Sequence, residues 1–268
     1  MLGRQQAILD RLEQRGTCDY QELADAFGVS TMTIRRDVDH LARQGMLIKV
    51  LGGVQRATAP ASLYESKLYA RFAEHRAEKL AIARAALELI EGRQTVFLDG
   101  STSCYELAKL LARERRVLTL VTNSALLCPE LAASNQNMVV GIGGQYDPDS
   151  MCFTGPTTEE AAAKYFVDLA FVSTKGFVPD EGTFESNIAN FHVKQIIARQ
   201  AVKVILLVDH SKFDQRALSK VLDITQIHTV VTDDRTPAPA LEVLRRHGRE
   251  VHVAPVSSLS ASDAAHAV

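Results

Sequence analysis

The sequence lacks tryptophan and contains no apolar run of the roughly 18 residues that are needed to span a bilayer. Its first residues form a polar amphipathic pattern without a hydrophobic signal-peptide core, so we expect a cytoplasmic protein with no membrane partner. An excess of one charge is also missing, because 30 basic and 32 acidic residues leave a net charge of −2. This balance excludes a uniformly basic nucleic-acid-binding protein, and any DNA contact must come from a local patch.

Cysteine is scarce, and its spacing excludes the common metal motifs. Cys18, Cys104, Cys128 and Cys152 are scattered, without the CxxC or CxxxH spacing that is typical of structural zinc sites. In a reducing compartment, we expect these residues to be free and mostly buried thiols. We therefore predict no metal site and no cofactor. The remaining composition, 46% hydrophobic and 23% charged, is that of an ordinary globular protein with a sizeable core.

The pattern along the chain predicts two domains of unequal size. Residues 1–56 are predicted to form a small winged helix-turn-helix domain, and residues 75–255 an α/β domain with a mostly parallel sheet. Residues 57–74, which include Pro60, form the predicted linker. The small, polar residues 256–268 are predicted to be a disordered tail.

The first domain has the pattern of a helix-turn-helix followed by a hairpin. Apolar residues at helical spacing predict helices over residues 3–16, 20–27 and 31–44, and Ser30 is a good N-cap for the third of them. The β-prone residues 46–55, interrupted by two glycines, predict a two-stranded wing. Such an arrangement places one helix, here the third, in the major groove of DNA.

The third helix and the wing carry side chains that are suited to DNA. Hydroxyl and guanidinium groups reach base edges and phosphates, and a helix N-terminus favours phosphate. Residues 30–56 hold five basic and two acidic residues, a local net charge of +3. Because this excess is modest, we expect few phosphate contacts per subunit and a homodimer or homotetramer on double-stranded DNA. The candidate DNA-contacting residues are Ser30, Thr31, Thr33, Arg35, Arg36 and Lys49.

A plainer explanation of this segment remains open at this point, because many amphipathic helix pairs show the same pattern. Asp37 in particular is predicted as a structural partner of a nearby arginine or backbone amide, since a carboxylate in the DNA-contacting helix repels phosphate.

In the second half, apolar, mostly β-branched segments alternate with helical ones. This alternation indicates a parallel sheet that is covered by helices. A charged helix, predicted over residues 66–90, precedes the first strand. The predicted strands are residues 95–98, 118–121, 138–142, 169–173, 204–208, 229–231 and 250–253.

Small polar residues follow three of these strands directly. Ligands of open α/β sheets bind at the carboxyl ends of the strands, where hydroxyls, glycine amides and a helix N-terminus suit phosphate. Nearby lysines would add positive charge. Each piece alone has a structural alternative, since such hydroxyls are often helix caps, Asp99 could brace its own loop, and a lone lysine is usually solvated. The candidate ligand-binding residues are Asp99, Gly100, Ser101, Thr102, Ser103, Thr122, Asn123, Ser124, Lys175, Lys194 and Lys212.

Residues 30–38, Ser-Thr-Met-Thr-Ile-Arg-Arg-Asp-Val, resemble the signature of the DeoR family of bacterial regulators. The resemblance covers the chain to about Asp234, including residues 97–103, 121–124 and 209–213. It implies a DNA-binding repressor whose second domain is ribose-5-phosphate-isomerase-like and binds a phosphorylated sugar or sugar derivative that relieves repression. It also implies that the loops 100–103 and 122–124 hold phosphate or sugar hydroxyls, and that Lys194 and Lys212 line the pocket.

The sequence departs from the related isomerases and from the family at two points. The isomerases carry acidic catalytic residues where this chain has residues 173–176, Ser-Thr-Lys-Gly, and Glu185 is the one carboxylate left nearby. Isomerisation needs a positioned base, so we predict binding without turnover, and no enzyme. Asn190 and His192 replace the family's glutamate near Lys194, and His192 is equally consistent with a ligand contact and a helix-face residue. The alternatives are a sugar-phosphate isomerase with an added DNA-binding domain, and an architectural DNA-binding protein.

Overall fold

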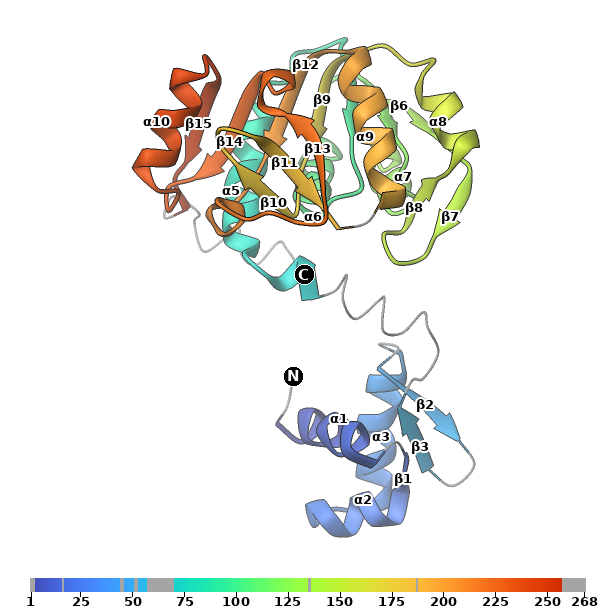
Figure 1. Ribbon diagram of the computed structural model, residues 1–268. Coiled ribbons are helices and arrows are strands. Elements are labelled where there is room, and N and C mark those ends of the chain that lie inside the picture. Colours follow the sequence, from blue (N-terminus) through green and yellow to red (C-terminus); the bar gives the residue numbers. More distant parts are fainter. Residues whose placement is uncertain are drawn as a thin grey trace. The chain divides into compact units, whose positions relative to one another are not determined.

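The computed structural model describes residues 3–15, 17–43, 46–50, 53–56, 70–134, 136–186 and 188–256. They belong to two compact units, Met1–Ala70 and Arg71–Val268 (Figure 1). We call these the N-terminal unit and the C-terminal unit. Most of the predicted linker (residues 57–69), the turn of the wing (51–52) and the predicted tail from residue 257 lie outside the described residues.

Between residues 3 and 56, the described part of the N-terminal unit contains three helices and a small antiparallel sheet in the strand order β1-β3-β2. The helices are α1 (Gly3–Arg15), α2 (Tyr20–Phe27) and α3 (Thr31–Arg43), and the strands are β1 (Thr17–Asp19), β2 (Leu47–Val50) and β3 (Gly53–Arg56). The three predicted helices and the predicted hairpin are confirmed, whereas the short strand β1 was not predicted.

Local signals set the ends of these helices. The carboxylate of Asp19 accepts a hydrogen bond from the amide of Glu22 at 2.6 Å and caps α2. Gly28, with a φ of 62°, ends α2 in the left-handed conformation that glycine adopts without strain. The core of the unit forms where the apolar faces of the three helices meet, around Ile8, Leu23 and Ile34.

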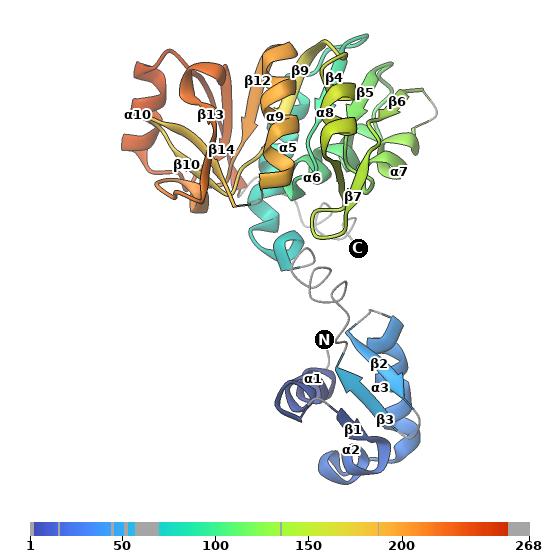
Figure 2. The ribbon, with the colours of Figure 1, turned by 45° about the vertical axis from the view of Figure 1, so that its right-hand side comes forward.

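The C-terminal unit is built on a seven-stranded parallel sheet in the order β15-β14-β12-β9-β4-β5-β6 (Figure 2). All seven predicted strands are present in it. They are β4 (Thr95–Leu98), β5 (Thr119–Thr122), β6 (Met138–Gly141), β9 (Val167–Val172), β12 (Ala201–Leu207), β14 (Thr229–Asp233) and β15 (Glu250–Ala254).

Helices cover both faces of this sheet. On one face, strand residues such as Val96 and Leu120 pack against α5 (Arg76–Leu87), α6 (Thr102–Leu111) and α7 (Leu127–Ala132). On the other face, residues such as Phe97 and Ala170 pack against α8 (Pro156–Ala162) and α9 (Ile188–Gln200). The helix α10 (Ala238–Arg246) packs near the β14 end of the sheet through Ala240 and Leu244. This layering leaves the carboxyl ends of β4, β5, β9 and β12 along one edge, where the loops can meet.

Two smaller sheets were not predicted. One is an antiparallel sheet of β10 (Gly176–Val178), β11 (Gly182–Glu185) and β13 (Ser219–Asp223), and the other is the hairpin of β7 (Gln145–Asp147) and β8 (Cys152–Thr154). Two short 3₁₀ helices, His210–Lys212 and Ile224–Gln226, complete the unit. No helix among the described residues is long and apolar enough to cross a bilayer.

The prediction of one continuous helix over residues 66–90 is wrong. Among the described residues, a helical stretch at 70–73 is followed by a turn, and α5 begins only at Arg76. His75 breaks the helix, with a φ of 49°. The ammonium of Lys79 binds the carbonyls of Arg71 and Glu74, the latter at 2.6 Å, and so satisfies oxygens that a continuous helix would pair with its own amides.

Candidate DNA-contacting helix and ligand site

The exposed face of α3 carries both arginines that the sequence singled out. Ile34, Val38 and Leu41 are fully buried, whereas Arg35 and Arg36 are exposed. Met32, on the same exposed face, has 63% of its surface accessible, which is unusual for methionine. An apolar side chain at this position can contact the methyl group of thymine. The sequence analysis missed Met32, although the helical spacing from Arg35 and Arg36 could have indicated it.

The hydroxyls at the start of α3 are engaged with the helix itself. The Oγ of Ser30 accepts a hydrogen bond from the amide of Thr33 at 3.2 Å, and the hydroxyls of Ser30 and Thr33 lie 3.0 Å apart. Ser30 is therefore the N-cap that the sequence predicted. Thr31 is half-buried at the first helical position. These residues fix the N-terminal turn of α3, and Arg35 and Arg36 follow in the next turn.

Asp37 and Lys49 are both held by partners inside the unit. The carboxylate of Asp37 pairs with the guanidinium of Arg4 at 2.5 Å, which confirms its predicted structural role. Lys49, on β2, pairs with Asp39 of α3 at 2.7 Å, and this partner raises the pKa of the lysine. The pair connects the wing to the DNA-contacting helix. The side chain of Lys49 is half-exposed, and Asp39 neutralises part of the positive charge that it could present to a phosphate.

In the C-terminal unit, the carboxylate of Asp99 organises the carboxyl edge of the sheet. Asp99 follows β4 directly and is 1% exposed. One of its oxygens accepts the amide of Ser101 at 3.0 Å, and the other accepts the amide of Ser173 at 2.9 Å. The same oxygen lies 3.1 Å from the ammonium of Lys194, which reaches it from α9. Asp99 thus joins the loops that follow β4 and β9 to a helix on the other side of the sheet edge.

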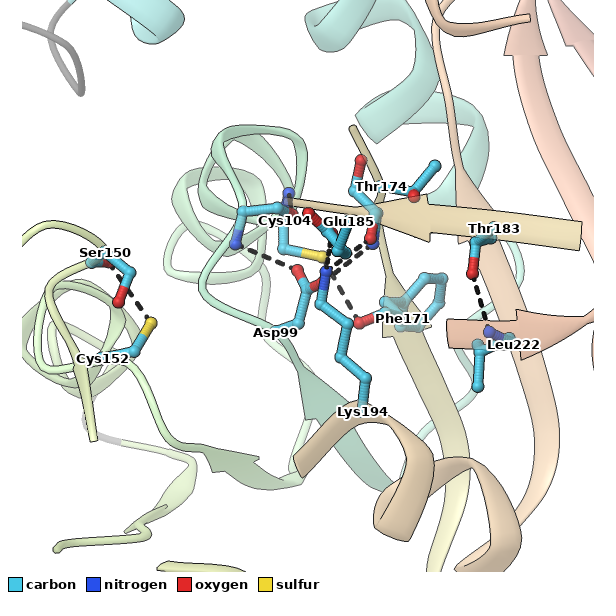
Figure 3. Close-up of polar contacts among 12 residues, drawn as sticks. Asp99, Cys104, Ser150, Cys152, Phe171, Thr174, Thr183, Glu185, Lys194 and Leu222 are labelled. Atoms are coloured by element: carbon cyan, nitrogen blue, oxygen red, sulfur yellow. Dashed lines mark hydrogen bonds and ion pairs between the residues drawn. The ribbon is translucent and has the colours of Figure 1, made fainter. Parts of the chain in front are cut away.

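Lys194 lies between two carboxylates. Figure 3 shows its ammonium meeting Asp99 and Glu185, with the Glu185 oxygen at 2.6 Å and the carbonyl of Ser173 at 2.7 Å. Burial alone would lower the pKa of Lys194, but Glu185 and Asp99 outweigh it and hold that pKa above its ordinary value. Burial would likewise raise the pKa of Asp99, yet Lys194 and the two amides keep it below its ordinary value. Lys194 and Asp99 are therefore held as an ion pair at neutral pH.

The small polar loops beside this cluster are braced by their own side chains. Ser101 caps α6 by accepting the amide of Cys104 at 3.2 Å, and Thr122 donates to the carbonyl of Leu98 at 2.8 Å. The Asn123 amide donates to the carbonyl of Phe153 at 2.9 Å, and the Ser124 hydroxyl accepts the amide of Leu127 at 3.4 Å. Thr102 and Ser103 are buried at the start of α6. The alternative explanation of these hydroxyls as caps and braces thus holds for Ser101 and Ser124, and the loops are pre-formed.

Gly100 is where these loops pack closest together. A Cβ atom added there would lie 2.0 Å from the sulfur of Cys152 and 3.4 Å from the Cβ of Ser124. The loops after β4 and β5 and the first residue of β8 therefore meet at a single glycine. Burial raises the pKa of the Cys152 thiol to about 12, so this sulfur serves as neutral packing and not as a nucleophile.

Gly100→Ala is expected to destabilise the C-terminal unit by about 1–3 kcal/mol, because overpacking in a fixed core costs that much. Urea unfolding of the variant measures the loss. Gly92→Ala is the matched control, since a Cβ at Gly92 meets no atom within 4 Å. Cys152→Ala should relieve the clash, so the double variant should be no less stable than Cys152→Ala alone. A double variant that carries the full sum of both losses would contradict this packing.

Lys212 belongs to a second group of charges, and Lys175 is exposed. Lys212 follows β12 and lies near Lys79, a buried lysine of α5. Burial and the charge of Lys212 lower the pKa of Lys79, and the charge of Asp209 opposes this in part. No contact among the described residues joins Lys212 or Lys175 to the Asp99–Lys194–Glu185 cluster. Lys79 was not identified from the sequence, because nothing in its spacing distinguishes it from the other charged residues of its helix, yet it lies on the buried face.

His192 is a helix-face residue by its contacts. Its Nδ1 lies 3.1 Å from a carboxylate oxygen of Glu159 on α8, and its side chain is 45% exposed. These contacts place His192 on the exposed surface of α9, beside Glu159. The side chain of Asn190 lies outside the described part of the structure.

The arrangement of acids at this edge suits binding better than proton transfer. A general base must have a carboxylate free to reach the substrate proton. Here the carboxylates of both Asp99 and Glu185 accept from Lys194, and that of Asp99 also accepts two backbone amides. Lys194 and Glu185, whose side chains are 12% and 17% exposed, are the members of the cluster that a sugar hydroxyl could reach.

Comparison with known proteins places both units in described families. Residues 4–59 match the DeoR-like helix-turn-helix domain, and residues 74–234 match the DeoR C terminal sensor domain. The transcriptional repressor AccR of Agrobacterium fabrum is 31% identical over 87% of this chain and 90% of its own length. The glycerol-3-phosphate regulon repressor of Escherichia coli is 28% identical over 91% of this chain and 95% of its own length.

One solved structure that overlaps the chain is ribose 5 phosphate isomerase A from Neisseria gonorrhoeae. It covers 52% of this chain and 53% of the isomerase, with a TM-score of 0.39 and 15% sequence identity. At this TM-score the overlap establishes neither a shared fold in detail nor a shared activity.

Proposed function

The chain belongs to the DeoR family of transcription regulators, and from this membership we propose that it represses a carbohydrate-metabolism operon under the control of a phosphorylated sugar or sugar derivative. The N-terminal unit would bind operator DNA through α3, and the C-terminal unit would bind the effector at the carboxyl edge of its sheet. The observation that carries the effector assignment is the Asp99–Lys194–Glu185 cluster, with Asp99 buried and the other two residues partly buried, beside pre-formed polar loops. The cluster lies at the carboxyl ends of the parallel strands, where open α/β sheets bind their ligands.

The roles within the DNA-contacting surface follow from exposure. Arg35 and Arg36 are exposed on α3 and would contact base edges or phosphates. Ser30, Thr31 and Thr33 form the first turn, and this helix N-terminus would lie against a phosphate of the DNA backbone. Lys49 would add a phosphate contact from the wing. Because one small domain reads only a short half-site, we propose that a homodimer or larger oligomer binds double-stranded DNA.

The roles within the effector site follow from charge. Lys194 is already neutralised by two carboxylates, so the cluster would take the hydroxyls of the sugar. The backbone of residues 100–103 and 122–124 would cradle the phosphate, with positive charge from Lys212 or Lys175. The protein would bind its ligand without converting it, because the acids that isomerisation needs are occupied.

Thermal unfolding against a panel of phosphorylated sugars, with the matching free sugars as controls, tests the effector. A ligand present at about 100 times its Kd adds roughly 2.7 kcal/mol of stability to the unit that binds it. We expect one phosphorylated sugar to stabilise the protein and its free sugar to have no effect. Operator affinity measured at fixed salt should then fall when that compound is added, since coupling requires different affinities for the free and DNA-bound forms.

Two results would overturn parts of this proposal. A compound that stabilises the protein but leaves operator affinity unchanged would refute the coupling of the two units. A compound that is converted to a product, as followed by NMR, would show that the C-terminal unit is an enzyme.

A further inference from the structure

Tyr20 lies beneath one of the arginines of the DNA-contacting helix. Tyr20 is the first residue of α2 and is 8% exposed, so its ring forms part of the core between α2 and α3. The guanidinium carbon of Arg35 lies over this ring, 4.4 Å from its centroid. A cation at this distance from an aromatic face is within the range of cation–π attraction.

This contact differs from those of the other cations of the unit. Arg4 uses its Nε–H on Asp37, and Lys49 uses a donor on Asp39. Arg35 has no carboxylate or carbonyl partner among the described residues, and it meets Tyr20 through the face of the ring. All five N–H donors of a guanidinium lie in its plane, so a contact with the face of a ring leaves them free. The ring therefore restrains the arginine and leaves its N–H donors available for hydrogen bonds to DNA.

The electrostatic surroundings act in the same direction. Lys49 lies close enough for its charge to be affected by those of Arg35 and Asp39. The lysine repels the guanidinium, and Asp39 holds the lysine at 2.7 Å on the wing. Arg35 therefore has an aromatic ring beneath its guanidinium and a second cation nearby, and its side chain is exposed on α3.

We propose that Tyr20 is a positioning residue for DNA recognition, which holds Arg35 in place for a bidentate contact with a guanine in the major groove. The proposal rests on the function proposed above and adds a specificity-determining role to a residue outside α3. Arginine bound to guanine O6 and N7 is the commonest specific contact in this groove, and ordering the side chain beforehand reduces what binding must fix.

Two variants of Tyr20 separate positioning from folding. Tyr20→Phe keeps the ring and the core, and Tyr20→Leu keeps an apolar side chain but removes the aromatic face. The DNA is a duplex that the wild-type protein enriches from a random-sequence pool, compared with a shuffled duplex of the same composition. We expect Tyr20→Leu to weaken binding of the enriched duplex about 2- to 5-fold for each copy of the N-terminal unit that is bound. Tyr20→Phe should match the wild type.

Affinity for the shuffled duplex and its salt dependence distinguish a loss of positioning from a loss of fold. A loss of fold would change both quantities, whereas a loss of positioning would change neither. Tyr20→Leu should bind the shuffled duplex as the wild type does, with the same salt slope, because every charge is retained. In an Arg35→Ala background, Tyr20→Leu should have no further effect, because the tyrosine acts through the arginine.

The outcomes distinguish this inference from the function on which it rests. If the wild type enriches no sequence, specific DNA binding fails, and the role of Tyr20 fails with it. If the wild type enriches a sequence but Tyr20→Leu binds that duplex equally well, the positioning role alone is refuted. The same holds if Tyr20→Leu weakens binding as much in the Arg35→Ala protein as it does in the wild type.

Discussion

Replacing Lys194 with methionine is expected to destabilise the C-terminal unit by about 3–5 kcal/mol, the usual loss when one partner of a buried ion cluster is removed. Methionine fills a similar volume, so the loss reports charge and not a cavity. The buried Asp99 and the partly buried Glu185 would remain without their shared cation. Urea unfolding followed by circular dichroism measures the difference from the wild type.

The pH dependence of this loss identifies its cause. In the wild type, the pKa of Asp99 is held low, so its contribution to stability is present above its unfolded pKa and is lost as pH falls through the lower folded value. Without Lys194, burial should raise that pKa above its ordinary value, and the folded variant should take up a proton as pH falls. The destabilisation should therefore be largest near pH 7 and smaller at pH 5.

Two further variants serve as controls. Lys203→Met makes the same chemical change in an exposed pair with Glu250, at 3.7 Å, and should change stability by less than about 0.5 kcal/mol. Asp99→Asn should destabilise the wild type but recover part of the loss in the Lys194→Met protein, because it removes an unpaired buried charge. A Lys194→Met protein that is as stable as the wild type at pH 7 would contradict the cluster described here.

The sheet of the C-terminal unit could be predicted because buried parallel strands are continuous apolar runs that end in polar residues. All seven were found for this reason, as in Thr95–Leu98 followed by Asp99. The strands β10 and β11 could not be found, since three or four residues beginning with glycine carry no periodicity. The break at His75 depends on the reach of Lys79 to two carbonyls, a contact that helical spacing does not encode.

The strand-end loops of the candidate site could be predicted from the sequence, but the contacts between its charged residues could not. Asp99, Ser101 and Thr122 follow strands and were identified by position alone. That Lys194 of α9 meets Asp99 depends on how a helix crosses the carboxyl end of the sheet. That Lys212 lies instead near Lys79 depends on the position of β12, which β9 separates from β4. Sequence position cannot distinguish these two lysines, whereas packing can.

Arg35→Ala and Arg36→Ala are each expected to abolish specific DNA binding while leaving the C-terminal unit intact. A bidentate arginine contact contributes about 1–3 kcal/mol of discrimination, and a dimer on two half-sites makes it twice. The resulting loss is at least about 30-fold in affinity for the enriched duplex. Both side chains are exposed on α3, so their removal leaves no cavity in the core around Ile34. Titration of the duplex at fixed salt measures the loss.

The contrast between the two arginines tests how α3 meets DNA. If Arg36 contacts phosphate, Arg36→Ala should weaken enriched and shuffled duplexes alike and reduce the salt slope, whereas Arg35→Ala should mainly erase the preference between them. Arg216→Ala removes the same charge from an exposed pair with Glu181 in the C-terminal unit, and it should change neither. Equal affinity of all three variants and the wild type would exclude α3 as the DNA-contacting helix. A variant that also loses the thermal transition of the C-terminal unit would have lost its fold, because no DNA-contacting residue stabilises that unit's core.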